Sequence, residues 1–168
     1  MTQPALKTQT SNLDPQSGLK FEQRREVAEA LSMAVSDTYR VFIMTQGVHW
    51  NVQGPLFYSV HKLTEDQYRD MFEAIDDLAE RIRALGFPAP QTIEALTRTS
   101  QLEEPAPGAE LEKQIEALVA ANESIAERMR PAVHAAEEKD DVKSADLLTD
   151  RIGVHEENAW MLRAMIAS

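Results

Sequence analysis

The stretch His-Trp-Asn-Val-Gln-Gly-Pro-Leu-Phe-Tyr-Ser-Val-His, residues 49–61, separates two long helical patterns. Its centre, Gln53-Gly54-Pro55, is typical of a turn, because glycine and proline interrupt helices. On either side, apolar residues recur at steps of three and four, which predicts one buried face on each helix. The preceding stripe consists of Val27, Leu31, Ala34, Val35, Tyr39, Phe42 and Ile43. The following stripe consists of Val60, Leu63, Tyr68, Phe72, Ile75, Leu78, Ala79 and Ile82. We therefore expect helices at about residues 21–50 and 58–85.

Beyond these two helices, the pattern predicts a long connection and a second helical hairpin. Gly86 stands where a helix commonly ends, and residues 87–109 contain four of the 8 prolines. A short helix is expected within this connection, at 92–99. Two long helices follow, at about 109–138 and 143–166. The fold class is therefore all-α: a four-helix bundle with a long crossover connection that contains a short helix.

Composition excludes several classes of protein. The chain has 168 residues and no cysteine, so one domain is expected, without disulfides, thiolate metal sites or cysteine nucleophiles. Its 28 acidic residues outnumber 17 Lys and Arg, and the net charge of −11 disfavours general nucleic-acid binding but suits hard cations. Residues 1–20 lack an apolar face, so we expect a flexible N-terminal tail followed by the bundle domain at 21–168. No apolar run approaches the roughly 18 residues of a membrane span, and we expect a cytoplasmic protein with no membrane contact.

The second expected helix carries two pairs of potential metal ligands. His61 and Glu65 are four residues apart, as are Asp76 and Glu80, so each pair lies on one helix face. About three whole turns separate the pairs, which gives them the same direction but a spacing of roughly 16 Å. A single centre cannot use both pairs of one chain, but a two-fold dimer with antiparallel helices can bring one pair opposite the other. Mixed imidazole and carboxylate ligands suit iron, zinc or manganese.

The spacing alone leaves a second interpretation open, since acidic residues four apart are also common on solvated helix faces. Other metal patterns are incomplete: the chain has no Glu-x-x-His, and the zincin-like start His155-Glu156 has Ala159 where a second histidine is needed. We expect His134 on a helix surface and His155 in a structural role.

The turn and the second helix resemble the Dps family, the ferritin-like DNA-binding proteins from starved cells. The resemblance covers about residues 21–168 and implies a ferritin-like four-helix bundle that assembles into a hollow homododecamer. It implies a ferroxidase that oxidises Fe(II), preferably with hydrogen peroxide rather than oxygen, and stores ferric mineral. The matching residues are His49-Trp50-Asn51-Val52-Gln53-Gly54-Pro55, Phe57, His61, Tyr68, Asp76, residues 79–86, His155-Glu156 and residues 159–163.

The resemblance also assigns ligands. It groups His49, His61 and Glu65 of one chain with Asp76 and Glu80 of its two-fold partner. The family usually has aspartate where this chain has Glu65, and the longer side chain contacts the metal either directly or through water. Iron, as Fe(II) and Fe(III), is the expected metal, with zinc or manganese as substitutes.

Two further assignments have alternatives. Trp50 adjoins a ligand and either packs at the dimer interface or quenches stray oxidising equivalents. Asp140, Asp141 and Asp146 lie around the start of the last helix. They form either a capped, solvated turn or, as the resemblance implies, an acidic iron-uptake pore at a three-fold axis.

DNA binding receives uneven support from the sequence. Few cations lie near the N-terminus, and Asp14, Glu22 and Glu26 oppose them, so we expect weak, salt-sensitive binding. The alternative functions are a nucleoid-compacting DNA-binding protein with secondary iron chemistry, which would be nucleoid-associated, and a plain structural bundle with an incidental metal. The candidate DNA contacts are Lys7, Lys20, Arg24 and Arg25.

Overall fold

The computed structural model of the chain describes residues 15, 17–97, 100, 102–106 and 108–167, and these residues contain α-helices and no strand. The all-α prediction is therefore confirmed, and each expected helix is present with its ends within a few residues of the prediction. The helices are α1 (Phe21–Asn51), α2 (Phe57–Ala84), α3 (Ile93–Thr97), α4 (Leu111–Glu137) and α5 (Val142–Ile166).

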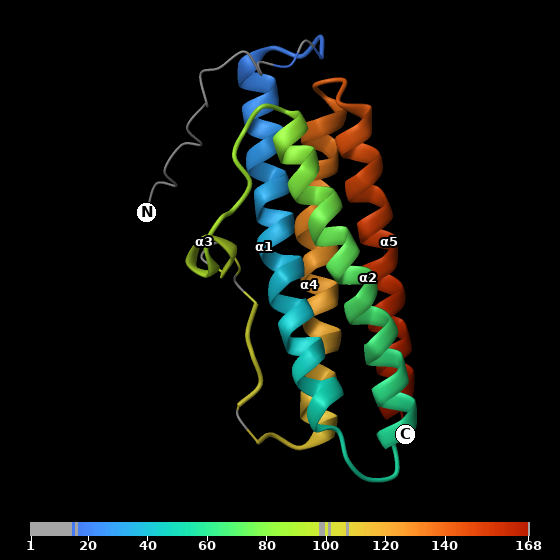
Figure 1. Cartoon of the computed structure of the whole chain (residues 1–168). Helices are drawn as coiled ribbons and strands as arrows, with labels where there is room; N and C mark the ends of the chain where they lie inside the picture. Colours follow the sequence, from blue (N-terminus) through green and yellow to red (C-terminus); the bar gives the residue numbers. More distant parts are fainter. Residues whose placement is uncertain (1–14, 16, 98–99, 101, 107, 168) are drawn as a thin grey trace.

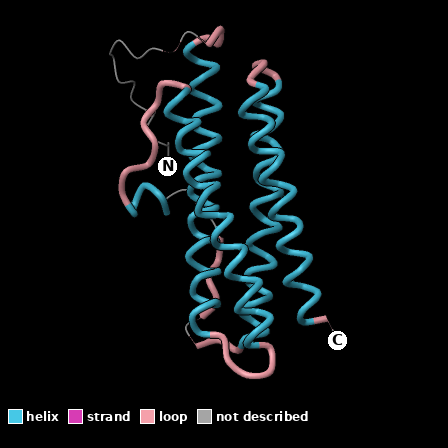
Figure 2. The backbone as a smooth tube through the Cα atoms, turned by 45° about the vertical axis from the view of Figure 1, so that its right-hand side comes forward, coloured by secondary structure: helices cyan, strands magenta, loops and turns pink. Residues whose placement is uncertain are grey.

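The four long helices form two hairpins that pack side by side. The hairpins are α1–α2 and α4–α5; α1 packs against α4, and α2 contacts α5 (Figure 1). The crossover from α2 to α4 runs along the length of the bundle, with α3 against α1 (Figures 1 and 2). The α1–α2 turn and the α4–α5 turn consequently lie at opposite ends of the bundle.

The core explains why these helices pair. Large apolar side chains from all four long helices are fully buried, and burying each one contributes about 1.5–3 kcal/mol. Ion pairs fix the antiparallel register of α1 and α4: Asp37 lies 3.3 Å from Arg128, and Glu26 lies 2.8 Å from Lys139, just beyond the end of α4. The largest fully buried side chains on the long helices include Leu31, Met71, Leu78, Ile82, Ile115, Leu118, Ile125, Met129, Leu148 and Leu162.

The expected glycine stop ends α2. Gly86 has φ +91°, a left-handed conformation that favours glycine. Its N–H donates to the Arg83 carbonyl at 2.9 Å, and the Phe87 N–H donates to the Ile82 carbonyl at 3.2 Å. Arg24 of α1 also donates to the Leu85 carbonyl at 2.8 Å, so α1 satisfies a carbonyl at the end of its neighbour.

None of the helices in the described part of the chain combines the length and the apolarity needed to cross a membrane.

Candidate metal centre

Two predicted ligands meet at the α1–α2 end of the bundle. His49, near the end of α1, and His61, in the second turn of α2, stack with ring centroids 3.8 Å apart. The Nδ1 atom of His49 lies 2.9 Å from the carbonyl oxygen of His61, and Nδ1 of His61 lies 3.0 Å from the carbonyl oxygen of His49. The turn between the helices therefore brings the two imidazoles together, as a shared site requires.

These contacts decide which nitrogen of each ring can bind a metal. A backbone carbonyl only accepts hydrogen bonds, so each Nδ1 must carry the proton and donate it. Each Nε2 then keeps a free lone pair, which is the arrangement that orients histidine ligands in metal sites. Thr64 of α2 lies beside the pair, with Oγ1 3.4 Å from Nδ1 of His49, and donates to the Val60 carbonyl at 2.7 Å.

Aromatic side chains surround the pair. Phe57 stacks on His61 with centroids 5.1 Å apart, and Tyr68 meets His49 edge-on at 5.1 Å. His49 is buried, with 8% of its surface exposed. This packing restricts the movement of both rings.

Glu65 lies one turn beyond His61, and its carboxylate pairs with two cations of its own helix. Lys62 donates a hydrogen bond to it, and Arg69 lies 2.6 Å away. The Lys62 hydrogen bond, followed by the charges of Arg69 and Lys62, lowers the pKa of the Glu65 carboxyl. The carboxylate is therefore ionised, as a metal ligand must be. To bind a metal, it must break its ion pairs with Lys62 and Arg69 or keep one oxygen on them while the other binds the metal.

Asp76 and Glu80 lie further along α2, and both are exposed. Asp76 lies roughly 16 Å along the helix from Glu65, and Glu80 lies about one turn further. Among the described residues, no three His, Asp or Glu side chains of one chain gather closely enough to hold a metal. The structure thus brings two predicted ligands together, leaves Glu65 beside them, and separates Asp76 and Glu80 from them.

Trp50 follows His49 and is 69% exposed. Other large apolar side chains on α1 and α2 are also exposed, so the α1–α2 hairpin carries apolar surface. Exposed apolar surface of this kind commonly marks an interaction site. The most exposed of these side chains are Ile43, Phe57, Tyr58 and Phe72.

The three aspartates of the expected pore differ from one another. Asp141 is buried, caps α5 by accepting from the Ser144 N–H at 3.1 Å, and accepts from Arg81 of α2 at 2.6 Å. Asp140 is exposed and has φ 58°, and Asp146 is exposed at 3.3 Å from Lys143. Asp141 therefore has a structural role. From the sequence, this role corresponds to the alternative of a capped turn, without the contact to Arg81.

The candidate DNA contacts need one correction. Arg24 is 4% exposed, because its guanidinium reaches across to the end of α2, and it is not available to contact phosphate. Arg25 pairs with Glu22 at 2.6 Å, and Lys20 is exposed at the start of α1. Lys7 lies outside the described residues.

The other two histidines are not near the pair. His134 is exposed on α4, 3.4 Å from Glu137. His155 is completely buried in α5, where Nδ1 lies 2.8 Å from Oδ1 of Asn122.

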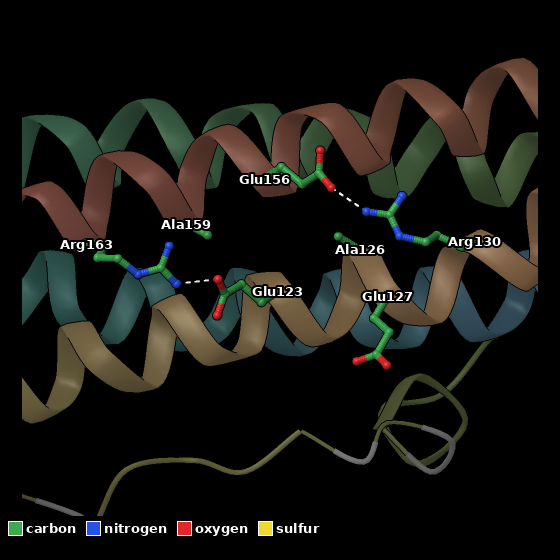
Figure 3. Close-up of a pocket in the computed structure, with 7 residues that line it drawn as sticks. All are labelled: Glu123, Ala126, Glu127, Arg130, Glu156, Ala159 and Arg163. Carbon is green, nitrogen blue, oxygen red and sulfur yellow. Dashed lines mark hydrogen bonds and ion pairs between the residues drawn. The ribbon is translucent and has the colours of Figure 1, made fainter.

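A groove with a volume of about 250 Å³ lies between α4 and α5 (Figure 3). Two ion pairs cross it: Arg130 to Glu156 at 2.5 Å, and Arg163 to Glu123. Glu127 points away from both pairs. Because four of its five charged side chains are paired, this groove offers no open set of ligands comparable with the histidine pair.

Comparison with known proteins connects this geometry to a family. A ferritin-like domain model matches residues 28–168. The DNA protection during starvation protein 2 of Bacillus anthracis is 32% identical over 142 residues, covering 84% of this chain and 97% of that protein. The chain belongs to the Dps family of ferritin-like proteins.

Two further relatives agree with this membership. A low temperature-induced protein of Nostoc sp. strain PCC 7120 is 37% identical over 153 residues, covering 89% of this chain and 84% of that protein. The crystal structure of the Dps protein from Vibrio cholerae O1 superposes with a TM-score of 0.85 at 26% identity, covering 94% of this chain and 99% of that one. That protein is described as a member of the ferritin-like diiron-carboxylate superfamily. Membership in the Dps family supports a general role for this chain in iron binding, iron storage and protection.

Proposed function

We propose that this Dps family member is a ferroxidase that oxidises Fe(II), preferably with hydrogen peroxide, and stores the ferric product in a hollow homododecamer in the cytoplasm. The observation that carries the proposal is the His49–His61 pair, in which both Nδ1 atoms are committed to backbone carbonyls. The two free Nε2 atoms, beside an ionised Glu65, suit a borderline metal such as iron. Zinc and manganese would compete for the same ligands.

The proposed site is shared between two chains. Asp76 and Glu80 of the two-fold partner would complete it, because the same residues of one chain lie too far along α2 to reach the histidines. The exposed apolar side chains on α1 and α2 support a partner subunit against this hairpin. Trp50, Tyr58 and Phe72 are 69%, 75% and 65% exposed, and a partner subunit would cover them. For Trp50 we propose interface packing as the main role, with quenching of stray oxidants as the alternative.

The chemistry follows from the donor set. Few nitrogen ligands and several carboxylates hold Fe(II) weakly and allow Fe(III) to leave toward a mineral surface. Two Fe(II) ions each give one electron to one peroxide molecule, whose O–O bond breaks. With two water molecules the products are two ferric oxyhydroxide units and four protons, which pass to solvent. Because peroxide takes both electrons, no hydroxyl radical is released, and the reaction protects as well as stores.

Iron uptake is proposed to occur where Asp140 and Asp146 of three chains converge. Both carboxylates are exposed, as an electrostatic funnel for Fe(II) requires. Asp141 is left out of this proposal, because its carboxylate is occupied by Ser144 and Arg81.

The deciding experiment measures peroxide-driven and aerobic Fe(II) oxidation together with particle size on one sample of the full chain. We expect faster oxidation with peroxide and a particle of about twelve times 18.9 kDa. A monomer with full activity would rule out the shared site. A particle of the expected size without Fe(II)-dependent peroxide consumption would favour the purely structural bundle.

A further inference from the structure

The interior of the bundle contains polar atoms without hydrogen-bond partners. Among the described residues, such atoms include Oγ1 of Thr45 on α1, Oε1 of Gln67 on α2, and Nε2 of His155 and Nδ2 of Asn158 on α5. Each of these side chains is at most 5% exposed. An unpaired buried polar atom costs about 1–3 kcal/mol, so four of them in one region call for a ligand.

The contacts between helices place these residues at neighbouring levels of the bundle. Gln67 donates from Nε2 to the Asn158 carbonyl at 3.5 Å, which joins α2 to α5. Gln67 follows Thr64 by three residues on α2, and Thr45 precedes His49 by one turn on α1. Since Thr64 lies 3.4 Å from the His49 ring, Thr45 and Gln67 lie about one turn deeper in the bundle than the histidine pair.

The paired atoms of the same side chains determine what the unpaired atoms can do. Asn122 donates from Nδ2 to the Leu118 carbonyl at 2.8 Å, so its Oδ1 faces His155 and accepts from Nδ1. Nε2 of His155 is therefore an acceptor. Gln67 uses its NH₂ group on Asn158, so its Oε1 is also an acceptor.

Donors and acceptors are thus unpaired in the same region. The Asn158 amide donates, the Thr45 hydroxyl does both, and Oε1 of Gln67 and Nε2 of His155 accept. Only a small molecule that donates and accepts can satisfy all four, and water does so in protein interiors with about three hydrogen bonds.

A metal cation fits this place poorly. Arg151 lies beside His155 and bonds to Asp70 at 3.1 and 2.6 Å. Burial, followed by the Arg151 charge, lowers the pKa of His155 to about 3. The same positive charge that opposes a proton on His155 opposes a metal ion there.

We propose that ordered water binds in the bundle interior between Thr45, Gln67, Asn158 and His155. This water site is separate from the proposed iron site and joins α1 and α2 to α5 through hydrogen bonds. Its existence does not depend on ferroxidase activity.

The first test replaces Thr45 with valine, which keeps the shape of the side chain and removes the hydroxyl. If water bonds to the hydroxyl, Thr45→Val lowers the midpoint of thermal unfolding of the full assembly by about 2–4 °C. If the hydroxyl is unpaired, valine raises the midpoint, because a buried polar atom is removed without loss of a bond. Ser36→Ala is the matched control, since the Ser36 hydroxyl on the same helix already donates to the Ser32 carbonyl at 3.0 Å.

The second test is a high-resolution crystal structure of the intact protein, with one crystal soaked in Zn²⁺. We expect water within hydrogen-bond distance of Nε2 of His155 and Oε1 of Gln67, and no anomalous zinc signal between them. Zinc at this position, an interior without ordered water, or a more stable Thr45→Val variant would each overturn the proposal.

Discussion

Nδ1 of His49 donates to the backbone carbonyl of His61 at 2.9 Å, and Nδ1 of His61 donates to the backbone carbonyl of His49 at 3.0 Å. This reciprocal arrangement leaves both Nε2 atoms free, and each ring is oriented by the backbone of the other residue and by stacking on its ring. A substitution at either histidine therefore removes one ligand and the ring stacking at 3.8 Å, but it keeps the backbone carbonyl that orients the other ring.

We expect His61→Ala to lower the rate of Fe(II) oxidation by roughly tenfold or more, with helicity and assembly preserved. Asp76→Ala should have a similar effect, because it is proposed to complete the same site from the other chain. The decisive measurement co-expresses the two variants. A dimer with one chain of each kind contains one intact site, so activity should return in the mixed assemblies. If it does not, the two residues do not meet across a two-fold axis.

Asp141 predicts a stability effect rather than an effect on iron. Asp141→Ala removes the cap of α5 and leaves Arg81 without its carboxylate, which should cost about 2–4 kcal/mol in the free energy of unfolding. Asp146→Asn is the control, since Asp146 is exposed and its loss should change stability by less than about 0.5 kcal/mol. Chemical denaturation of both variants checks this, and equal stabilities would remove the structural role assigned to Asp141.

Iron uptake should depend on the two exposed aspartates. Asp140→Asn combined with Asp146→Asn should slow Fe(II) uptake most at low ionic strength, because salt screens the attraction of exposed charges. The initial rate of uptake at two salt concentrations is the measurement. Unchanged uptake at low salt would place the route of iron elsewhere.

The buried His155 predicts a pH dependence of stability. Its pKa is lowered to about 3 in the folded chain, so the unfolded chain binds a proton more readily below about pH 6.5. The stability that neutral His155 contributes is fully present above pH 6.5 and is lost as pH falls, by about 1.4 kcal/mol per pH unit. The unfolding midpoint of the natural chain should therefore fall from pH 7 to 6 to 5 more than that of His155→Gln, because glutamine does not titrate, and the difference between the two midpoints should become smaller. A difference that stays constant with pH would contradict the assignment.

DNA binding should be weak or absent at about 150 mM salt. With Arg24 buried, the candidate contacts that remain are few and flanked by acidic residues. Deletion of residues 1–19 should leave ferroxidase activity intact and abolish any low-salt binding in a gel-shift assay. Tight binding by the intact chain that resists salt would make nucleoid compaction the primary function.

The sequence alone determined the helices and their order. Apolar steps of three and four residues, the Gln53-Gly54-Pro55 turn and the Gly86 stop act over a few residues, and α1 and α2 end within two residues of the predicted positions. The same local spacing showed that Glu65 and Asp76 cannot serve one centre within a chain. These conclusions follow from helix geometry, which does not depend on what the helices pack against.

Only the tertiary structure decided how individual side chains are used. Arg24 looked like a surface cation beside Arg25, yet α1 packs so that its guanidinium reaches the Leu85 carbonyl of α2. Asp141 looked like its neighbour Asp140, yet Arg81 of α2 covers it. The tautomers of His49 and His61 depend on carbonyls twelve residues away along the chain, which the α1–α2 turn brings within hydrogen-bond distance. The burial of a side chain and its hydrogen-bond partners depend on contacts between helices, so the residue pattern along one helix does not predict them.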